Sequence, residues 1–178
     1  IIDETKDRKF MPNAEPVHPK VFQNLDDAYK TGFEVGLGLD FLNNYRFSAD
    51  VAYVYTRNKD LDESLPLTSP LRSNFELSYN KDKFYAGIFY KVVAKQSELA
   101  TSFGELQSTP GYALVDIKAN YNLTKNLNIG AAVLNVFDKF YFDHLNFAFR
   151  NQGASGLSMM DRLSDPGINA SVFVKYNF

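Results

Sequence analysis

Hydrophobic and polar residues alternate one by one along much of this chain, most clearly in residues 168–178. One face of that segment carries Ile168, Ala170, Val172, Val174, Tyr176 and Phe178, and the other carries Asn169, Ser171, Phe173, Lys175 and Asn177. Side chains of a β-strand point alternately to its two faces, so a period of two predicts a strand with one apolar face. A tilted strand crosses a bilayer with roughly 9 to 11 residues, and this segment is long enough.

Six further segments repeat the pattern. They cover residues 32–42, 45–56, 73–80, 84–95, 112–123 and 127–136, of which the last is the least regular. Their apolar faces, and that of the last segment, carry no charged residue. The opposite faces carry Glu34, Asp40, Arg46, Asp50, Glu76, Lys91, Lys95, Asp116, Lys118 and Lys175. The two faces of the predicted sheet must therefore meet different surroundings.

The connections between these segments are alternately short and long. Residues 42–44, 80–83 and 124–126 are polar and suit tight hairpin turns, whereas the links at about 57–72, 96–111 and 137–167 are long. Strict alternation places all turns at one end of an antiparallel, up-and-down sheet. Transmembrane β-barrels have this asymmetry, with short periplasmic turns and longer extracellular loops.

Aromatic residues of the apolar face gather near the short turns. They are Phe41, Tyr45, Tyr79, Phe84, Tyr121, Tyr176 and Phe178. One band of this kind is what an aromatic girdle at a membrane interface requires. A soluble barrel is the alternative, with aromatic residues filling its interior and charges outside. It gives no reason for collecting the aromatic residues at one rim, so we prefer the membrane interpretation.

Composition narrows the choice further. The 178 residues include 16 Phe and 11 Tyr, yet the mean hydropathy is -0.28. No stretch approaches the roughly 18 apolar residues of a spanning helix. The formal net charge of -2 gives no basic surface for nucleic acid, and the absence of Cys excludes disulfides and thiolate metal sites.

Several short motifs follow one another along residues 23–178. They are Gln23-Asn24-Leu25-Asp26-Asp27-Ala28 followed by Thr31-Gly32-Phe33-Glu34, then Leu65-Pro66-Leu67-Thr68-Ser69-Pro70, Thr109-Pro110-Gly111-Tyr112-Ala113-Leu114-Val115-Asp116, Leu134-Asn135-Val136-Phe137-Asp138-Lys139-Phe140-Tyr141, Asp165-Pro166-Gly167 and the terminal Phe178. In this order they resemble TonB-dependent outer-membrane receptors. Ile168 departs from the pattern, because the family usually has Arg after Pro-Gly. We expect Asn135 and Asp138 to fix a strand end and its loop rather than to contact substrate.

The resemblance implies an all-β fold: an antiparallel transmembrane barrel of about 22 strands, closed by a plug domain. Seven strands are an odd number, whereas bacterial single-chain barrels have even numbers. We therefore expect residues 1–178 to be the C-terminal part of the barrel domain, about seven strands, with the plug and the earlier strands absent.

The function implied by the resemblance is energy-dependent uptake, across the bacterial outer membrane, of a metal chelate (siderophore-like, haem or a metal ion) or a similar nutrient. The implied partners are outer-membrane lipid, the rest of the barrel, the plug, and through it an energising inner-membrane complex. Val174, Tyr176 and Phe178 resemble the terminal signal read by the barrel-assembly machinery. Two alternatives stay open: a small structural or adhesion barrel of the outer membrane, and a soluble ligand-binding β-barrel.

No catalytic constellation and no cofactor site is found in the sequence, so we do not expect an enzyme. The two histidines, His18 and His144, lie in predicted loops without a nucleophile in a recognisable context. The loop at 138–167 carries the substrate-contact candidates His144, Arg150, Met159, Met160 and Arg162. Imidazole and thioether groups would suit copper, whereas Arg would suit an anionic iron chelate. We prefer the simpler hypothesis that the Met pair packs against neighbouring loops, and we expect no firm metal site.

Overall fold

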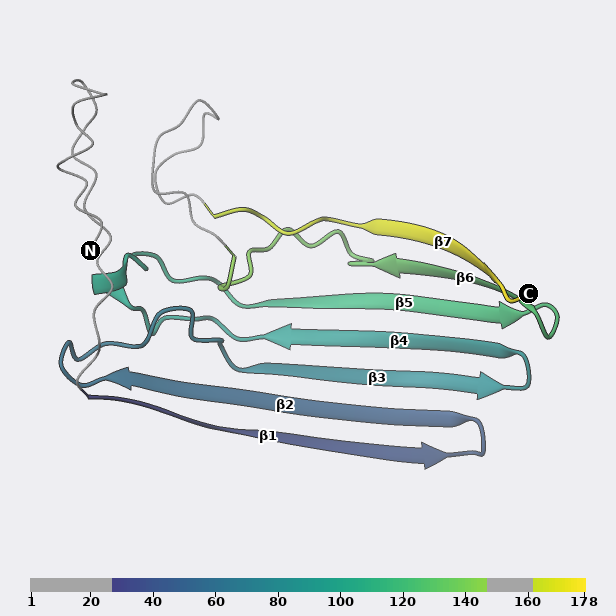
Figure 1. Ribbon diagram of the computed structural model, residues 1–178, viewed down its shortest axis with the longest axis horizontal. Coiled ribbons are helices and arrows are strands. Elements are labelled where there is room, and N and C mark those ends of the chain that lie inside the picture. Colours follow the sequence, from purple (N-terminus) through teal and green to yellow (C-terminus); the bar gives the residue numbers. More distant parts are fainter. Residues whose placement is uncertain (1–26, 147–161) are drawn as a thin grey trace, which may run out of the picture.

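The computed structural model describes residues 27–146 and 162–178. Seven β-strands form one sheet in the order of the sequence, each antiparallel to the next (Figure 1). They are β1 (Ala28–Phe41), β2 (Tyr45–Asn58), β3 (Arg72–Lys81), β4 (Phe84–Val93), β5 (Tyr112–Asn122), β6 (Leu127–Leu134) and β7 (Asn169–Tyr176). A short 3-10 helix, η2 (Thr101–Phe103), lies in the β4–β5 connection. The predicted up-and-down antiparallel strands are confirmed.

The strand bounds differ from the predicted ones mainly at the ends near the long connections. β1 begins at Ala28, four residues before the predicted start, because its first residues pair with the end of β2, with Ala28 opposite Asn58. β6 ends at Leu134 because Asn135 has a φ of 50°, a left-handed backbone that cannot continue a strand. A hydrogen bond from Val136 N to Val115 O, 2.8 Å long, resumes the pairing one residue later.

Two of the three short turns also take left-handed backbone conformations. In the β1–β2 turn the φ angles of Leu42 and Asn43 are 46° and 61°, and in the β3–β4 turn that of Asp82 is 52°. Positive φ matches the right-handed twist of paired strands, which is why tight hairpins use it. Asn and Asp accept this conformation readily, whereas Leu42 takes it at a cost.

All short turns lie at one end of the sheet and all long connections at the other (Figure 1). We call these the turn end and the loop end. The predicted asymmetry is confirmed. Within the described residues β1 and β7 are the two edges of an open sheet, and neither pairs with the other.

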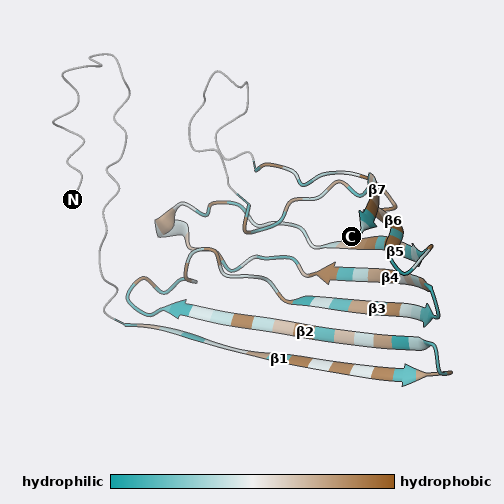
Figure 2. Cartoon of the chain, turned by 45° about the vertical axis from the view of Figure 1, so that its right-hand side comes forward, coloured by the Kyte–Doolittle hydropathy of each residue, from teal (hydrophilic) through white to brown (hydrophobic). Residues whose placement is uncertain are grey.

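Hydrophobic and hydrophilic residues alternate along the strands, as the colour bands of β1 and β2 in Figure 2 show. Because successive side chains point to opposite sides, this alternation separates an apolar face from a polar face. Apolar-face residues are widely exposed: Val35 is 61% exposed and Val172 is 75% exposed. Buried positions in the described residues are mostly polar and lie at the loop end, among them Thr56, Asn58 and His144. Packing in the described residues is therefore concentrated among the long connections at the loop end.

β2 and β3 are longer than predicted, and each adds one charged residue to the positions that point to the apolar face. Arg57 follows Tyr53 and Tyr55 at the loop end of β2, and Lys81 follows Tyr79 at the turn end of β3. Both lie at the margins, so the middle of the apolar face remains uncharged. Among residues 27–146 and 162–178, no helix has the length and apolar character needed to span a membrane.

Candidate functional site

The polar face is held by interactions between neighbouring strands. Its register places Glu34, Asp40, Asp50, Glu76 and Asp116 on the same side as Arg46, Arg72, Lys91 and Lys118. Asn74 Nδ2 donates to Asp50 Oδ2 at 2.7 Å. The Lys118 ammonium lies 4.5 Å from the ring centroid of Phe89, which gives a cation–π contact.

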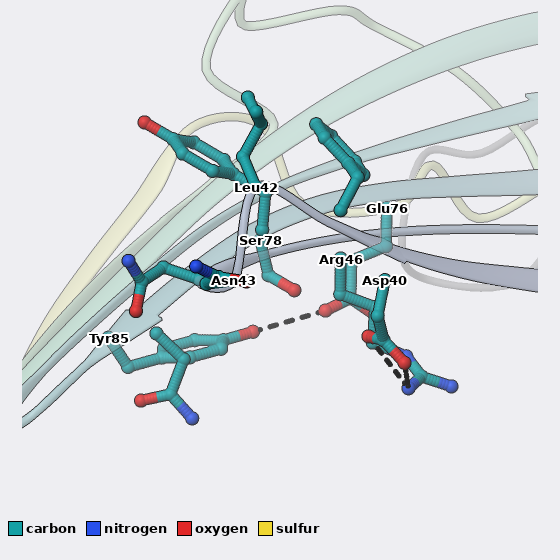
Figure 3. A pocket seen from close by; sticks show the side chains of 11 residues that line it. Asp40, Leu42, Asn43, Arg46, Glu76, Ser78 and Tyr85 are labelled. Carbon is teal, nitrogen blue, oxygen red and sulfur yellow. Dashed lines mark hydrogen bonds and ion pairs between the residues drawn. The ribbon is translucent and has the colours of Figure 1, made fainter.

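A pocket opens at the turn end of the polar face, over β1 to β4 (Figure 3). Arg46 Nη1 pairs with Asp40 at 3.2 Å, and the Tyr85 hydroxyl donates to Glu76 Oε1 at 3.3 Å. The Arg46–Asp40 pair is well exposed, and such pairs contribute at most about 1 kcal/mol. The pocket therefore presents a polar, solvated surface rather than a closed site.

The apolar face carries two aromatic bands, one at each end of the strands. At the turn end, ring contacts link Phe41 to Tyr45 (5.7 Å), Tyr45 to Tyr79 (4.9 Å) and Tyr79 to Phe84 (6.3 Å), so the predicted band is confirmed over β1 to β4. Contacts at the loop end form a second band that the sequence did not reveal. Its members, on β1 and β2, are Tyr29 with Tyr55 and Phe33 with Tyr53. The contact of Phe75 with Tyr90 lies in mid-strand, because Phe75 is opposite Ala49, which pairs with Leu37.

Two aromatic bands separated by an uncharged zone suit a bilayer. Along β1 the two bands are represented by Phe33 and Phe41, eight positions apart. At about 3.3 Å per residue this separation is about 26 Å along the strand, which a tilt of about 40° reduces to about 20 Å. Including Tyr29 raises it to about 30 Å on the same reckoning. An outward apolar band of a transmembrane barrel is about 25 Å tall.

Buried carboxylates bind the long connections together at the loop end. Glu63, in the β2–β3 connection, accepts hydrogen bonds from Thr101 Oγ1 (2.8 Å) and Ser102 N (3.0 Å) in the β4–β5 connection. Burial alone would raise the pKa of Glu63, but these hydrogen bonds stabilise the carboxylate and the net pKa is lowered. The charge of Glu63 thus stabilises the contact between two loops.

Glu105, in the β4–β5 connection, accepts one hydrogen bond from the β2–β3 connection and one from its own connection. Its Oε1 accepts from Leu67 N at 2.7 Å, and its Oε2 accepts from Ala100 N at 3.1 Å. Leu67 has a φ of 56°, so this hydrogen bond supports a strained backbone position. The His144 side chain lies beside Glu105 and is fully buried.

The β6–β7 connection is fixed at its base by the motif residues. Asn135 Nδ2 donates to Lys139 O (2.9 Å) and Pro166 O (3.3 Å), and its Oδ1 accepts from Lys139 N (2.8 Å). Asp138 Oδ1 accepts from Ile168 N at 2.9 Å. The expectation that Asn135 and Asp138 fix a strand end and loop is confirmed.

The structure places the predicted substrate-contact residues in different settings. His144 is buried, with 1% of its surface exposed, and its carbonyl oxygen accepts from Arg162 Nη1 at 2.7 Å. The same Arg162 nitrogen reaches Asn146 O at 3.1 Å. These two candidates are thus brought together but turned to the protein rather than to solvent. Arg150, Met159 and Met160 lie outside the described residues, so substrate contact by the five residues stays a prediction.

The predicted assembly residues lie along the exposed edge strand. Val174 and Tyr176 are on the apolar face of β7, 64% and 54% exposed, and the Phe178 ring follows them, 5.1 Å from that of Tyr176. This arrangement satisfies the alternating pattern but does not test recognition by an assembly factor.

In the described parts of the chain, no three His, Asp or Glu side chains are grouped to hold a metal ion.

Sequence reasoning missed the buried and half-buried carboxylates of the loop end. Glu63, Glu105, Asp143 and Asp165 stand in polar loops and offer no periodic signal. The sequence places Tyr112 only at a strand end, whereas its hydroxyl donates to Asp143 Oδ2 at 2.8 Å. Asp165 Oδ2 accepts from Asp143 N at 3.0 Å. Their partners are distant in sequence, so only the fold reveals them.

Comparisons with known proteins agree with this geometry. Residues 5–136 match the family described as TonB dependent receptor-like, beta-barrel. The vitamin B12 transporter BtuB of Photobacterium profundum is 30% identical over 125 residues, which is 66% of this chain and 19% of that protein. The "Probable TonB-dependent siderophore receptor PiuA" of Acinetobacter baumannii is 26% identical over 140 residues, 71% of this chain and 19% of that protein.

Solved structures show the same fold. The copper transporter OprC superposes with a TM-score of 0.79 and 29% identity, covering 85% of this chain and 24% of that chain. A mutant of the ferric enterobactin receptor PfeA from Pseudomonas aeruginosa gives a TM-score of 0.68 at 23% identity, covering 87% of this chain and 23% of that chain. The chain spans about a fifth of the length of the curated relatives it matches. With its family match over residues 5–136, the chain belongs to the TonB-dependent receptor β-barrel family.

Proposed function

We propose that residues 1–178 form the C-terminal part of the barrel of an outer-membrane TonB-dependent receptor. The receptor takes up a metal chelate, whether siderophore-like, haem or a metal ion, or a similar scarce nutrient. Uptake draws energy from an inner-membrane complex that acts through a plug domain. The barrel has about 22 strands in this proposal, of which β1 to β7 are about a third.

The single observation that carries the proposal is the separation of the two faces between two aromatic bands. The apolar face is uncharged in its middle, as lipid contact requires. The backbone N–H and C=O groups at an open sheet edge would lack hydrogen-bond partners in lipid. We therefore expect further strands to pair with β1 and β7.

The polar face is the proposed lumen wall. Its charges and hydrogen-bonding groups suit contact with a plug and with water-filled space. The pocket at the turn end would then face the periplasmic side, and the connected loops would face the cell exterior. Val174, Tyr176 and Phe178 would be read by the barrel-assembly machinery when the last strand is inserted.

The substrate is the least constrained part of the proposal. The relatives are described as a vitamin B12 transporter, a siderophore receptor and a copper transporter, so their names span several cargo types. Of the five predicted contact residues, His144 and Arg162 are engaged by the protein itself. Contact with substrate by Arg150, Met159 or Met160 stays a prediction. We infer transport rather than catalysis, because the named relatives are transporters and receptors.

Growth and uptake measurements test this function. Cells lacking the full-length receptor should lose uptake of one cargo from a panel of ferric chelates, haem, cobalamin and copper. Complementation should restore it, and a protonophore should abolish it. If cells lacking the receptor still took up every cargo in the panel at the wild-type level, the proposal would be contradicted. Passive permeation through the purified protein, independent of energy, would favour an open pore.

Two alternatives make different predictions. A small structural or adhesion barrel needs a complete and even set of strands and predicts no nutrient phenotype. A soluble ligand-binding barrel predicts that the apolar face is turned inward. The gathering of aromatic residues of the apolar face at the turn end disfavours the soluble alternative.

A further inference from the structure

His144 lies where long connections of the loop end meet. Its side chain belongs to the β6–β7 connection and is fully buried. Nδ1 lies 3.1 Å from Thr109 Oγ1, in the β4–β5 connection. Nε2 has no hydrogen-bond partner and lies 3.7 Å from Glu105 Oε2. A buried imidazole nitrogen without a partner is uncommon, and it invites an explanation beyond packing.

Glu105 extends this contact to another loop. The Glu105 carboxylate lies beside the His144 ring. It also accepts hydrogen bonds from Leu67 N in the β2–β3 connection and from Ala100 N in the β4–β5 connection. The His144 backbone is held in turn by Arg162, whose guanidinium donates to the His144 carbonyl oxygen at 2.7 Å. One buried cluster, made of His144, Glu105, Thr109 and Arg162, therefore joins three long loops.

The charged groups around the imidazole act in both directions. Glu105 and Asp143 favour protonation of His144, whereas Arg162 opposes it. Asp143 is itself held by Tyr112 and Asp165 and is influenced by Lys91 of β4. Burial is the largest influence, and it lowers the pKa of His144 below its ordinary value. The imidazole is therefore neutral in the closed arrangement at neutral pH.

We propose that His144 is a pH-sensitive latch: as a neutral, buried side chain it holds the three loops closed, and its protonation in mild acid releases them. Release exposes the imidazolium to water and frees Leu67 N and Ala100 N from a fixed carboxylate. The proposal concerns the loops alone and goes beyond the proposed transport function. It holds or fails whatever the cargo is.

The sign follows from linkage. In the open loops His144 titrates near 6.5, and in the closed loops it titrates lower. Above pH 6.5 both arrangements hold a neutral imidazole, so the closed arrangement keeps its full stability. Below it the open arrangement takes up the proton first, and the closed-to-open ratio falls by up to about tenfold per pH unit. The fall ends once the pH has passed the pKa of the closed arrangement.

Hydrogen–deuterium exchange of the full-length receptor in detergent tests the latch. Exchange at pH 7.5 and pH 5.0 is compared after correction for the intrinsic amide rate at each pH. Protection of the amides of Leu67 and Ala100 should fall at pH 5.0, by at most about 30-fold. Protection in the β3–β4 turn, which lies at the opposite end of the sheet, should stay the same. Unchanged protection of both loop amides would overturn the proposal.

A matched pair of variants assigns the effect to one residue. His144→Gln keeps hydrogen-bonding capacity but cannot be protonated, so the protection of Leu67 and Ala100 should become independent of pH. His18→Gln removes the other histidine of the chain and should leave the wild-type response. An equal loss of protection at pH 5.0 in His144→Gln and wild type would overturn the proposal.

A measurement on the unmodified protein covers the case in which His144→Gln fails to fold. Deuterium exchange at the imidazole C2 position, followed by mass spectrometry across a pH series, reports the pKa and the solvent access of single histidines. We expect slow exchange at His144 above pH 6.5 and a titration midpoint below that value. A midpoint at or above 6.5 would overturn the latch.

Discussion

A charge on the apolar face of the last strand is the sharpest perturbation of the proposed membrane orientation. Val172 lies on that face of β7, opposite Ala131 of β6, and 75% of its surface is exposed. Substitution by Arg changes no buried contact of a core. In water it would therefore be nearly neutral, because substitutions at exposed sites usually stay within about 0.5 kcal/mol.

In a bilayer the same substitution is costly, and the strand gives its depth. Val172 is four residues from Tyr176, in the aromatic band of the turn end. Four residues span about 13 Å of strand, or about 10 Å of depth at a tilt of about 40°. In an apolar zone about 25 Å tall, Val172 is close to the midplane. Arg at that depth costs about 2–4 kcal/mol, a 30-fold to 1000-fold shift toward the unfolded state.

Folding yield and urea titration of the full-length protein in lipid vesicles measure this cost. Folded barrel is separated from unfolded chain by heat-modifiable gel mobility. Val172→Arg should shift the midpoint strongly, whereas Ser171→Arg, one residue away on the polar face and opposite Ala132, should be tolerated. Equal yields for the two variants, or a worse outcome for Ser171→Arg, would refute the assignment of the faces.

Three further predictions concern assembly, side-chain packing on the polar face and the base of the β6–β7 connection. Deletion of Phe178 should lower the amount of heat-modifiable barrel in cells without changing synthesis, and assembly at the normal rate would leave Phe178 only an anchoring role. A Cβ at Gly130 would meet the ring of Phe173 on the polar face, so Gly130→Val should destabilise by about 1–3 kcal/mol in urea titration. Combining it with Phe173→Ala should recover part of the loss, and the absence of any recovery would show that the ring is not the cause. Asn135→Gly keeps the left-handed backbone but removes the hydrogen bonds to Lys139 and Pro166, so limited proteolysis should cut the β6–β7 connection faster than in wild type, and an unchanged cleavage rate would contradict the fixing role.

The strands could be predicted because their signal is local. A period of two in Val172, Val174 and Tyr176 places these side chains on one face whatever the rest of the protein does. The ends were less well defined. Ala28 has no apolar alternation to mark it, and β1 begins there only because Asn58 pairs with it.

The loop-end contacts could not be predicted, for a physical reason. Glu105 is polar and sits in a polar loop, which normally indicates a solvated side chain. It is buried because Leu67, 38 residues away, brings an unpaired backbone N–H to it. The sequence places His144 in a loop as a chemically notable residue, but it gives no sign that the ring is enclosed. Burial of polar groups depends on which distant loops meet, and no periodicity encodes that.

Oxygen and nickel-chelate accessibility along β1 tests the central claim most directly. Single Cys residues from 33 to 40 would each carry a spin label in a full-length receptor otherwise free of Cys, reconstituted in lipid. We expect high access to oxygen and low access to the chelate at Phe33, Val35, Leu37 and Leu39, with oxygen access falling at each even position between them. Two results would contradict a lipid-facing apolar surface. One is accessibility that does not alternate between odd and even positions, and the other is oxygen access that peaks at Glu34, Gly36, Gly38 and Asp40.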